Sequence, residues 1–244
     1  ALCADRVLFN SRHNRDTLLE GAERLLKKLP DQVPAGLLEQ ILERADVLHV
    51  PLPESVFRPA EPVTGPLEIV WNHRWEFDKG PELLLAAVEQ LLAEKVDFRL
   101  HVVGQQFRRV PAVFAQLKQR LDASGQSGHW GHVENIEAYR QLLQRADVVL
   151  STALHDFQGI AVLEAVAAGC RPAVPNRLAY PELFDAEYRY DEEHETRALT
   201  AMLAQLSARK QRGETIKAPS VHHLSWSALQ EDWRRIIEMT ARGH

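Results

Sequence analysis

Residues 155–184 read HDFQGIAVLEAVAAGCRPAVPNRLAYPELF and hold the clearest local signal of architecture in the chain. After a polar start, apolar residues recur at helical spacing over 160–167, and Gly169 then supplies a helix end. A short apolar strand follows at 173–174. A loop, a helix and a strand in this order are typical of one unit of an α/β protein.

The same stretch contains a candidate anion site. Gly159 and Ile160 stand at the start of the predicted helix, where free backbone N–H groups and the helix dipole favour an anion. Asp156 precedes the helix, and Glu164 lies one turn inside it. These carboxylates would repel a bare phosphate, but they suit a phosphate flanked by sugars, whose hydroxyls donate to carboxylate oxygens.

Each carboxylate also has an ordinary structural explanation. Asp156 fits a helix N-cap, and Glu164 fits an exposed helical charge. The combined spacing of the two with Gly159 favours a ligand site.

The composition indicates a globular protein without an overall positive charge. The 244 residues are 45% hydrophobic and 26% charged, and the net charge of −5 leaves room only for a local basic patch as a nucleic-acid contact. No apolar run reaches the roughly 18–20 residues of a membrane span, and no signal peptide opens the chain. Cys3 and Cys170 lie far apart, which indicates a reducing compartment, so we expect a cytoplasmic protein.

Strand and helix patterns alternate from residue 67 onward. Strands are predicted at 67–71, 98–103, 130–133, 147–151 and 173–174, and helices at 81–94, 112–122, 136–144, 160–167 and 196–210. This alternation predicts an α/β fold with a doubly wound, Rossmann-like parallel sheet. Ligands of such sheets bind at the carboxyl ends of the strands, so the loops that follow the strands, at 72–80, 104–109, 131–135 and 152–159, are expected to open on one crevice.

The first fifty residues predict a smaller α/β segment. Its elements are a strand at 6–11, a helix capped by Ser11 or Asn14 and ending near 29, a helix at 37–44 and a strand at 47–50, with Pro30 and Pro34 between the helices. These are too few for a stable domain. We therefore interpret 1–62 as the last elements of an N-terminal domain plus a proline-rich linker, 63–220 as the Rossmann-like domain, and 221–244 as a final helix capped by Ser225.

Two cations precede the helix at 81–94. Arg74 and Lys79 lie in NHRWEFDKGPE, where a guanidinium fork and an ammonium beside a helix start suit a diphosphate. The alternative is a solvated loop in which Glu76 and Asp78 serve as ion-pair partners.

These residues resemble a known signature. The pattern Asp156-x7-Glu164 with Gly159 inside it, Pro181-Glu182 downstream and Arg74-x4-Lys79 upstream is similar to that of retaining GT-B glycosyltransferases of group 1, family 4. The resemblance implies that Asp156, where the family usually has Glu, contacts the donor sugar, and that Glu164 contacts the nucleotide ribose. It also implies that Arg74 and Lys79 neutralise the leaving nucleoside diphosphate, and that the final helix crosses back to the N-terminal domain.

The resemblance further implies a set of donor-binding residues. His132 and Val133 follow a strand at the point where related enzymes read the base through the backbone, and Glu182 matches an acidic position near the donor, with an N-cap as an equal alternative. The full predicted set is His132, Val133, Phe157, Gln158, Gly159, Ile160 and Glu182. The sequence has no Asp-x-Asp motif and no His/Cys cluster, so we expect no metal cofactor, with the cations in its place.

Longer motifs narrow the resemblance. They are similar to the enzymes that mannosylate queuosine in tRNA with GDP-mannose, and they read FNSRHN (9–14), WNHRWEFDKGPE (71–82), HWGHV (129–133), ADVVLSTALHDFQGIAVLEAVAAGC (146–170) and YPELF (180–184). This implies a GDP-mannose donor and a tRNA acceptor. The family has Glu at position 156 and an aromatic residue at position 158, where this chain has Asp and Gln.

The chemistry expected is retaining glycosyl transfer. No side chain is a convincing nucleophile, so a front-face attack assisted by the leaving group fits better than a covalent intermediate. We expect the acceptor side to lie on a missing N-terminal part, so that this chain binds nucleotide without turning over. Two alternatives stay open: a non-catalytic nucleotide-sugar-binding module, and a UDP-sugar epimerase of similar fold, although such epimerases lack the acidic-x7-Glu pattern.

Overall fold

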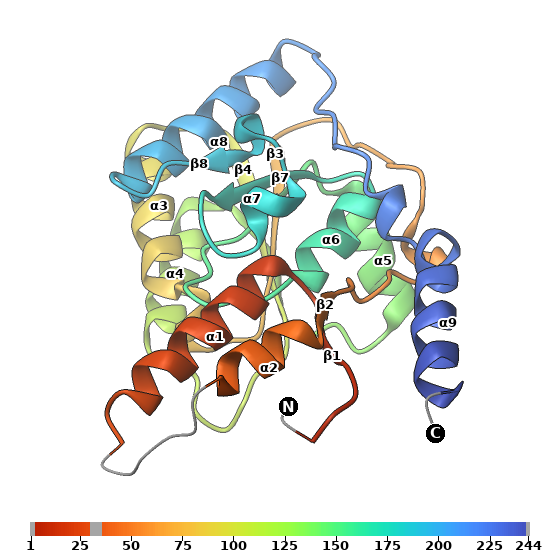
Figure 1. Ribbon diagram of the computed structural model, residues 1–244. Helices are drawn as coiled ribbons and strands as arrows, with labels where there is room; N and C mark the ends of the chain where they lie inside the picture. The colour runs from red at the N-terminus through yellow and green to blue at the C-terminus, as the bar shows by residue number, and fades with distance from the viewer. Residues whose placement is uncertain (1–2, 30–35, 243–244) are drawn as a thin grey trace. The chain divides into compact units, whose positions relative to one another are not determined.

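The structure is a computed structural model that describes residues 3–29 and 36–242. The chain divides into two compact units, one made of 1–54 with 223–244 and the other of 55–222 (Figure 1). The sequence predicts boundaries after 62 and 220, whereas the contacts place residues 55–62, the last eight of the predicted N-terminal segment, and residues 221–222 with the larger unit.

The larger unit is built on a six-stranded parallel sheet. In the order β5-β4-β3-β6-β7-β8, its strands are β5 (Ser127–Gly131), β4 (Phe98–Val103), β3 (Leu67–Asn72), β6 (Val148–Leu150), β7 (Arg171–Pro175) and β8 (Arg189–Tyr190). The prediction of a doubly wound sheet is confirmed. The chain starts at β3, builds outward to β5, then returns to β6 and builds outward on the other side. The strand order therefore reverses between β3 and β6, which is where ligands of such sheets bind.

Helices cover both faces of this sheet. Three lie on one face, α3 (Pro81–Ala93), α4 (Val113–Ser124) and α8 (Glu195–Gln211), and two on the other, α5 (Ile136–Arg145) and α6 (Ile160–Ala167) (Figure 1). A short helix, α7 (Tyr180–Leu183), follows β7. Every residue of β3 is buried, as expected for a central strand covered on both faces.

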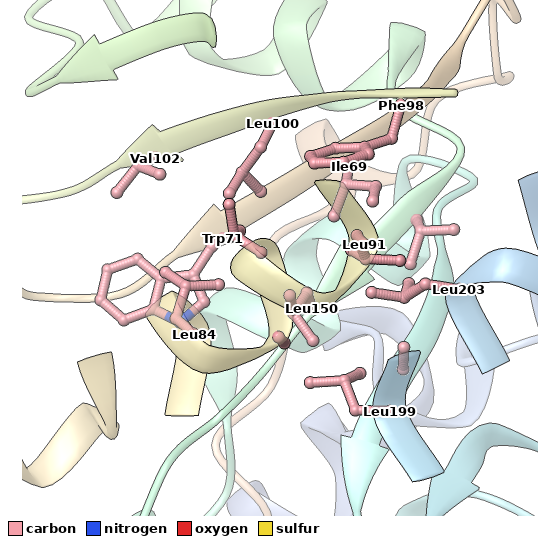
Figure 2. Close-up of a cluster of buried hydrophobic side chains, with 14 of the residues drawn as sticks. Ile69, Trp71, Leu84, Leu91, Phe98, Leu100, Val102, Leu150, Leu199 and Leu203 are labelled. Atoms are coloured by element: carbon pink, nitrogen blue, oxygen red, sulfur yellow. The ribbon is translucent and has the colours of Figure 1, made fainter. Parts of the chain in front are cut away.

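The main core lies between the sheet and the helices α3, α4 and α8. Alternate residues of β3, Ile69 and Trp71, point toward Leu84 and Leu91 of α3, while Leu203 comes from α8 (Figure 2). All five side chains are buried. Every second side chain of β3 and the apolar side chains on one face of α3 thus meet in the same core, and this contact joins the sheet to the helix layer.

In its described residues, the smaller unit contains a two-stranded parallel sheet and three α-helices. Its elements are β1 (Val7–Phe9), α1 (Arg12–Leu26), α2 (Leu37–Glu43), β2 (Ala45–Val47) and α9 (Trp226–Arg242). The predicted caps are confirmed, because Ser11 Oγ accepts from the Asn14 N–H (3.0 Å) and Ser225 Oγ accepts from the Ala228 N–H (3.2 Å). The Trp233 indole of α9 donates to the His49 carbonyl (3.2 Å), which ties the last helix to the early residues of this unit.

Some predicted boundaries are wrong. The strand expected at 47–50 is β2 at Ala45–Val47, and the strand expected at 130–133 is β5 at Ser127–Gly131. The first residues of β5 are Ser, Gly and His at the sheet edge, so hydrogen bonding to β4 places the strand where no apolar run marks it. The short elements α7 and β8 were not predicted, and the expected break at Pro30 and Pro34 lies outside the described residues. Within the described ranges, no helix is long and apolar enough to cross a membrane.

Candidate active site

Two loops meet where the strand order reverses. The loop after β3 carries Lys79 and the loop after β6 carries Asp156, which lie 77 positions apart in the sequence. The Lys79 ammonium donates to the His155 carbonyl (2.6 Å) and lies 3.5 Å from Asp156 Oδ2 and 3.3 Å from Asp78 Oδ2. Lys79 is only 7% exposed, so its charge is held inside the protein by these oxygens.

A chain of buried hydrogen bonds fixes the Lys79 backbone. The Trp71 indole donates to Thr152 Oγ1 (2.9 Å), and that hydroxyl donates to the Lys79 carbonyl (2.8 Å). Gly80 follows with φ +62°, and a Cβ there would lie 2.1 Å from the Thr152 carbonyl oxygen. Glycine at position 80 therefore lets the two loops approach closely enough for Lys79 to reach Asp156.

The start of α6 differs from the prediction. The Gly159 N–H is not free, because it donates to Asp156 Oδ1 (2.8 Å). The N-cap explanation for Asp156 is therefore correct in part: its carboxylate satisfies an amide beside the helix start, and its other oxygen faces Lys79. Ile160, the first helical residue, is 39% exposed, and its amide is one of those that lack an acceptor within a helix.

Arg74 stands apart from this arrangement. Its side chain is 52% exposed and forms an ion pair with Glu76 (2.8 Å), with Asp78 at 4.0 Å. The alternative of a solvated, ion-paired loop thus describes Arg74 as the structure has it. It does not describe Lys79, which is buried against a second loop.

A cavity of about 310 Å³ opens beside these loops at the carboxyl ends of β3, β4 and β5. Its wall includes His132 and Val133, the residues predicted to face the base. The full lining is Asn72, Val103, Gly104, Gln105, His132, Val133, Glu134, Ile136 and Tyr139. Asn72 donates to the Tyr139 hydroxyl (3.0 Å) and to the Ala161 carbonyl (2.7 Å). Its Oδ1 atom is buried and has no hydrogen-bond partner among the described residues.

Glu164 lies on α6, and its charge acts on Tyr139, a residue of the cavity wall. Burial raises the pKa of Glu164, and the positive charge of Arg140 opposes that effect. Burial also raises the pKa of Tyr139, with the Glu164 charge as a further cause. The carboxyl is half-buried, an environment in which a ligand hydroxyl can replace water as its partner.

The other predicted donor-binding residues are spread around the start of α6. Phe157 is partly exposed and packs edge-on against the His155 ring, with 4.6 Å between centroids. Gln158 is buried. Glu182 is exposed on α7, two residues beyond Tyr180, whose ring lies 2.9 Å from where a Cβ on Gly159 would stand.

His73 lies in the same loop as Lys79 and was not singled out from the sequence. Its side chain is 4% exposed, and its Nε2 atom has no hydrogen-bond partner in the described part of the chain. Burial lowers the pKa of His73 to about 4, while Asp156 acts in the opposite direction and Lys79 in the same direction. The imidazole is thus neutral at pH 7. Its position directly after a predicted strand was the available signal, but a lone histidine is usually structural.

The comparison with protein families decides the identity of this fold. Residues 54–217 match the family model described as glycosyl transferases group 1. The chain belongs to the group 1 glycosyl transferases. Residues 1–52 match a second model, described as the N-terminal part of tRNA-queuosine alpha-mannosyltransferase.

Two relatives of this group 1 glycosyl transferase illustrate the similarity. A tRNA-queuosine alpha-mannosyltransferase of Drosophila melanogaster is 36% identical over 200 residues, which covers 78% of this chain and 52% of the relative. A glycogen synthase of Mycobacterium tuberculosis is 31% identical over 155 residues, 63% of this chain and 36% of the relative. The chain therefore spans about half, or less, of the length of these relatives.

Solved structures agree on the GT-B type of fold. The pneumococcal O-GlcNAc transferase GtfA, in complex with UDP and GlcNAc, has a TM-score of 0.67 at 15% identity over 98% of this chain and 46% of its own. Anabaena HepE, in complex with UDP and glucose, has a TM-score of 0.70 at 15% identity over 97% of this chain and 64% of its own. The C-terminal domain of a group 1 family protein from Francisella tularensis has a TM-score of 0.54 at 20% identity, covering 68% and 92% of the two chains.

Proposed function

We propose that this chain is the donor-binding half of a retaining glycosyltransferase that transfers mannose from GDP-mannose to queuosine in tRNA. The observation that carries the donor site is the contact of buried Lys79 with the Asp156 loop, where the sheet order reverses. The name of the Drosophila relative and the match of residues 1–52 support the mannosyl donor and the tRNA acceptor.

In this proposal, cations stabilise the departing diphosphate. Lys79 supplies a positive charge that is already desolvated and in place, which makes it more effective than a flexible surface lysine. Arg74 exchanges Glu76 for phosphate oxygens when the donor binds, because both partners of its present ion pair reach solvent. The Ile160 amide, in the first turn of α6, adds a backbone donor.

The carboxylates position the sugars of the donor. Asp156 keeps one oxygen on the Gly159 amide, and its other oxygen orients the hydroxyls of the transferred sugar. Glu164 accepts a ribose hydroxyl beside the cavity that takes the base. We assign no nucleophile among the described residues, so in this proposal the acceptor attacks on the face from which the diphosphate leaves, and the proton it releases passes to a leaving phosphate oxygen.

Calorimetric titration of the chain with GDP, UDP, ADP and GDP-mannose tests the donor assignment. GDP and GDP-mannose are expected to bind selectively, and Lys79→Ala is expected to weaken both by about 10–100-fold, the range for a charged hydrogen bond. Lys217→Ala, which removes an exposed lysine, serves as the matched control. A preference for UDP together with isomerised product would favour the epimerase alternative, and nucleotide binding unaffected by Lys79→Ala would contradict the proposed site.

A further inference from the structure

The loop between β4 and α4 carries an exposed positive charge beside the donor crevice. Residues 104–111 read GQQFRRVP, with two arginines and no acidic residue. Arg108 and Arg109 are exposed, and neither forms an ion pair with an acid of the described chain. Phe107 next to them is 39% exposed.

The position of this loop is fixed at its start. Gly104 and Gln105 line the cavity, and the Gln105 carbonyl accepts from the Trp75 N–H (3.0 Å) in the loop that carries Arg74 and Lys79. Three residues of chain span at most about 11 Å, so Arg108 stays within that distance of the cavity wall. The cationic loop is therefore a rim of the crevice at the carboxyl ends of the strands.

The chemistry of this rim selects a nucleic acid among anionic partners. A guanidinium forks onto two phosphate oxygens, and an exposed ring stacks on an unpaired base. Because the chain has a net charge of −5, these two unpaired guanidiniums form a local positive patch on a surface that is negative on average. An acidic peptide would use the charges but would leave Phe107 without a role.

We propose that Phe107, Arg108 and Arg109 form a docking surface for the polynucleotide acceptor, with the arginines on backbone phosphates and the phenylalanine ring on an unpaired base. This inference rests on the proposed function for the presence of an acceptor RNA. It adds the place at which this chain binds that RNA, which is next to the cavity assigned to the base of the donor.

Fluorescence anisotropy with a fluorescein-labelled, unmodified tRNA transcript tests this surface. The 244-residue chain is titrated at several salt concentrations as wild type, Arg108→Ala/Arg109→Ala and Phe107→Ala. The double variant is expected to bind about tenfold more weakly at low salt, with a plot of log K against log[salt] that is shallower by about 1.4–1.8, the amount for two phosphate contacts. Phe107→Ala is expected to weaken binding by about 5–100-fold, but only for RNA with unpaired bases, so a fully paired RNA duplex is the second probe.

The matched control is Arg145→Ala/Lys217→Ala. It removes two exposed cations from the amino-terminal edge of the sheet, since Arg145 ends α5 just before β6, and the Lys217 carbonyl accepts from Arg171 at the start of β7. This control is expected to keep wild-type affinity.

Equal loss in the two double variants, or no binding of tRNA by the wild type, would overturn the docking surface. Titration of GDP on the same samples separates the proposals, because the rim variants are expected to leave GDP affinity unchanged, and a wild type that binds tRNA but no GDP would contradict only the donor site.

Discussion

At the scale of single residues, the site depends on a buried ammonium between carboxylates. Lys79 lies among the His155 carbonyl, Asp78 Oδ2 and Asp156 Oδ2, and a buried charge is stable only with such partners. The two carboxylates differ in what else they do. Asp156 also accepts from the Gly159 amide, whereas Asp78 lies on the same loop as Lys79.

This difference gives the first prediction. Asp156→Asn is expected to lower affinity for GDP-mannose by about tenfold relative to affinity for GDP, because only the former has sugar hydroxyls for the carboxylate. Asp78→Asn is the control and is expected to change both affinities by the same factor. Calorimetry with both ligands measures the ratio, and a ratio that Asp156→Asn leaves unchanged would sink the sugar-contact role.

Gly80 gives a second prediction at this scale. Gly80→Ala combines a left-handed φ of +62° with a Cβ placed 2.1 Å from the Thr152 carbonyl oxygen, so the free energy of unfolding is expected to fall by more than the about 1–2 kcal/mol of strain alone. Gly213→Ala shares the positive φ (+76°) but meets no atom within 4 Å, so its loss is expected to stay within that range. Urea denaturation of both variants makes the comparison, and equal losses would show that the loop contact is dispensable.

At the scale of elements, helix α5 forms one wall of the cavity. It contributes Ile136 and Tyr139, and its first turn is held by Asn135, whose Oδ1 accepts from the amides of Glu137 (2.8 Å) and Ala138 (3.2 Å). A side-chain cap of this kind aligns the start of the helix with the end of β5. The shape of the cavity thus depends on the Asn135 cap as well as on the residues that line it.

Removal of this cap is the third prediction. Asn135→Ala is expected to lower the free energy of unfolding by about 1 kcal/mol, the usual cost of a lost N-cap. Asn135→Asp keeps an acceptor oxygen and adds a charge favourable to the helix dipole, so it is expected to match the wild type. The midpoint of urea denaturation reports the loss, and an unchanged midpoint in Asn135→Ala would mean that water replaces the cap at no cost.

At the scale of the whole molecule, a buried histidine couples folding to pH. His73 has a pKa of about 4 in the folded chain because burial disfavours the imidazolium, whereas an unfolded histidine titrates near 6.5. Between these values the unfolded chain binds more protons than the folded one. The free energy of unfolding therefore decreases as the pH falls from about 6.5 to about 4.

The fourth prediction concerns this window. The contribution of His73 is at most about 3.5 kcal/mol, since one pKa unit corresponds to about 1.4 kcal/mol. His73→Asn is expected to show a shallower dependence on pH between 4 and 6.5 than the wild type, and the same dependence above pH 7. Urea denaturation at a series of pH values compares the two slopes, and parallel curves throughout would contradict the assignment.

Much of the architecture follows from local sequence. The apolar periods of β3, α3 and α6, the glycine before α6 and the serine caps of α1 and α9 are local features, and each predicted its element. The recurring alternation of strand and helix then predicted the doubly wound sheet, because parallel strands require helical crossovers. Elements without such a pattern were missed or misplaced: α7 is four residues long and β8 two, and neither was predicted, whereas β5 was predicted too late in the chain because it begins with polar residues at the sheet edge.

The site was predictable only in its composition. The sequence by itself predicted that Arg74, Lys79 and Asp156 stand in loops that follow strands of one sheet, and that Glu164 lies in the first turns of the helix after Asp156. Tertiary structure decided that Lys79 is buried against the Asp156 loop while Arg74 remains exposed. It also decided that Asp156 accepts a hydrogen bond from the Gly159 amide, and that His73 is buried. The physical reason is that burial and pairing depend on which loops the strand order brings together. β3 and β6 are neighbours in the sheet, although 75 residues lie between the end of β3 and the start of β6.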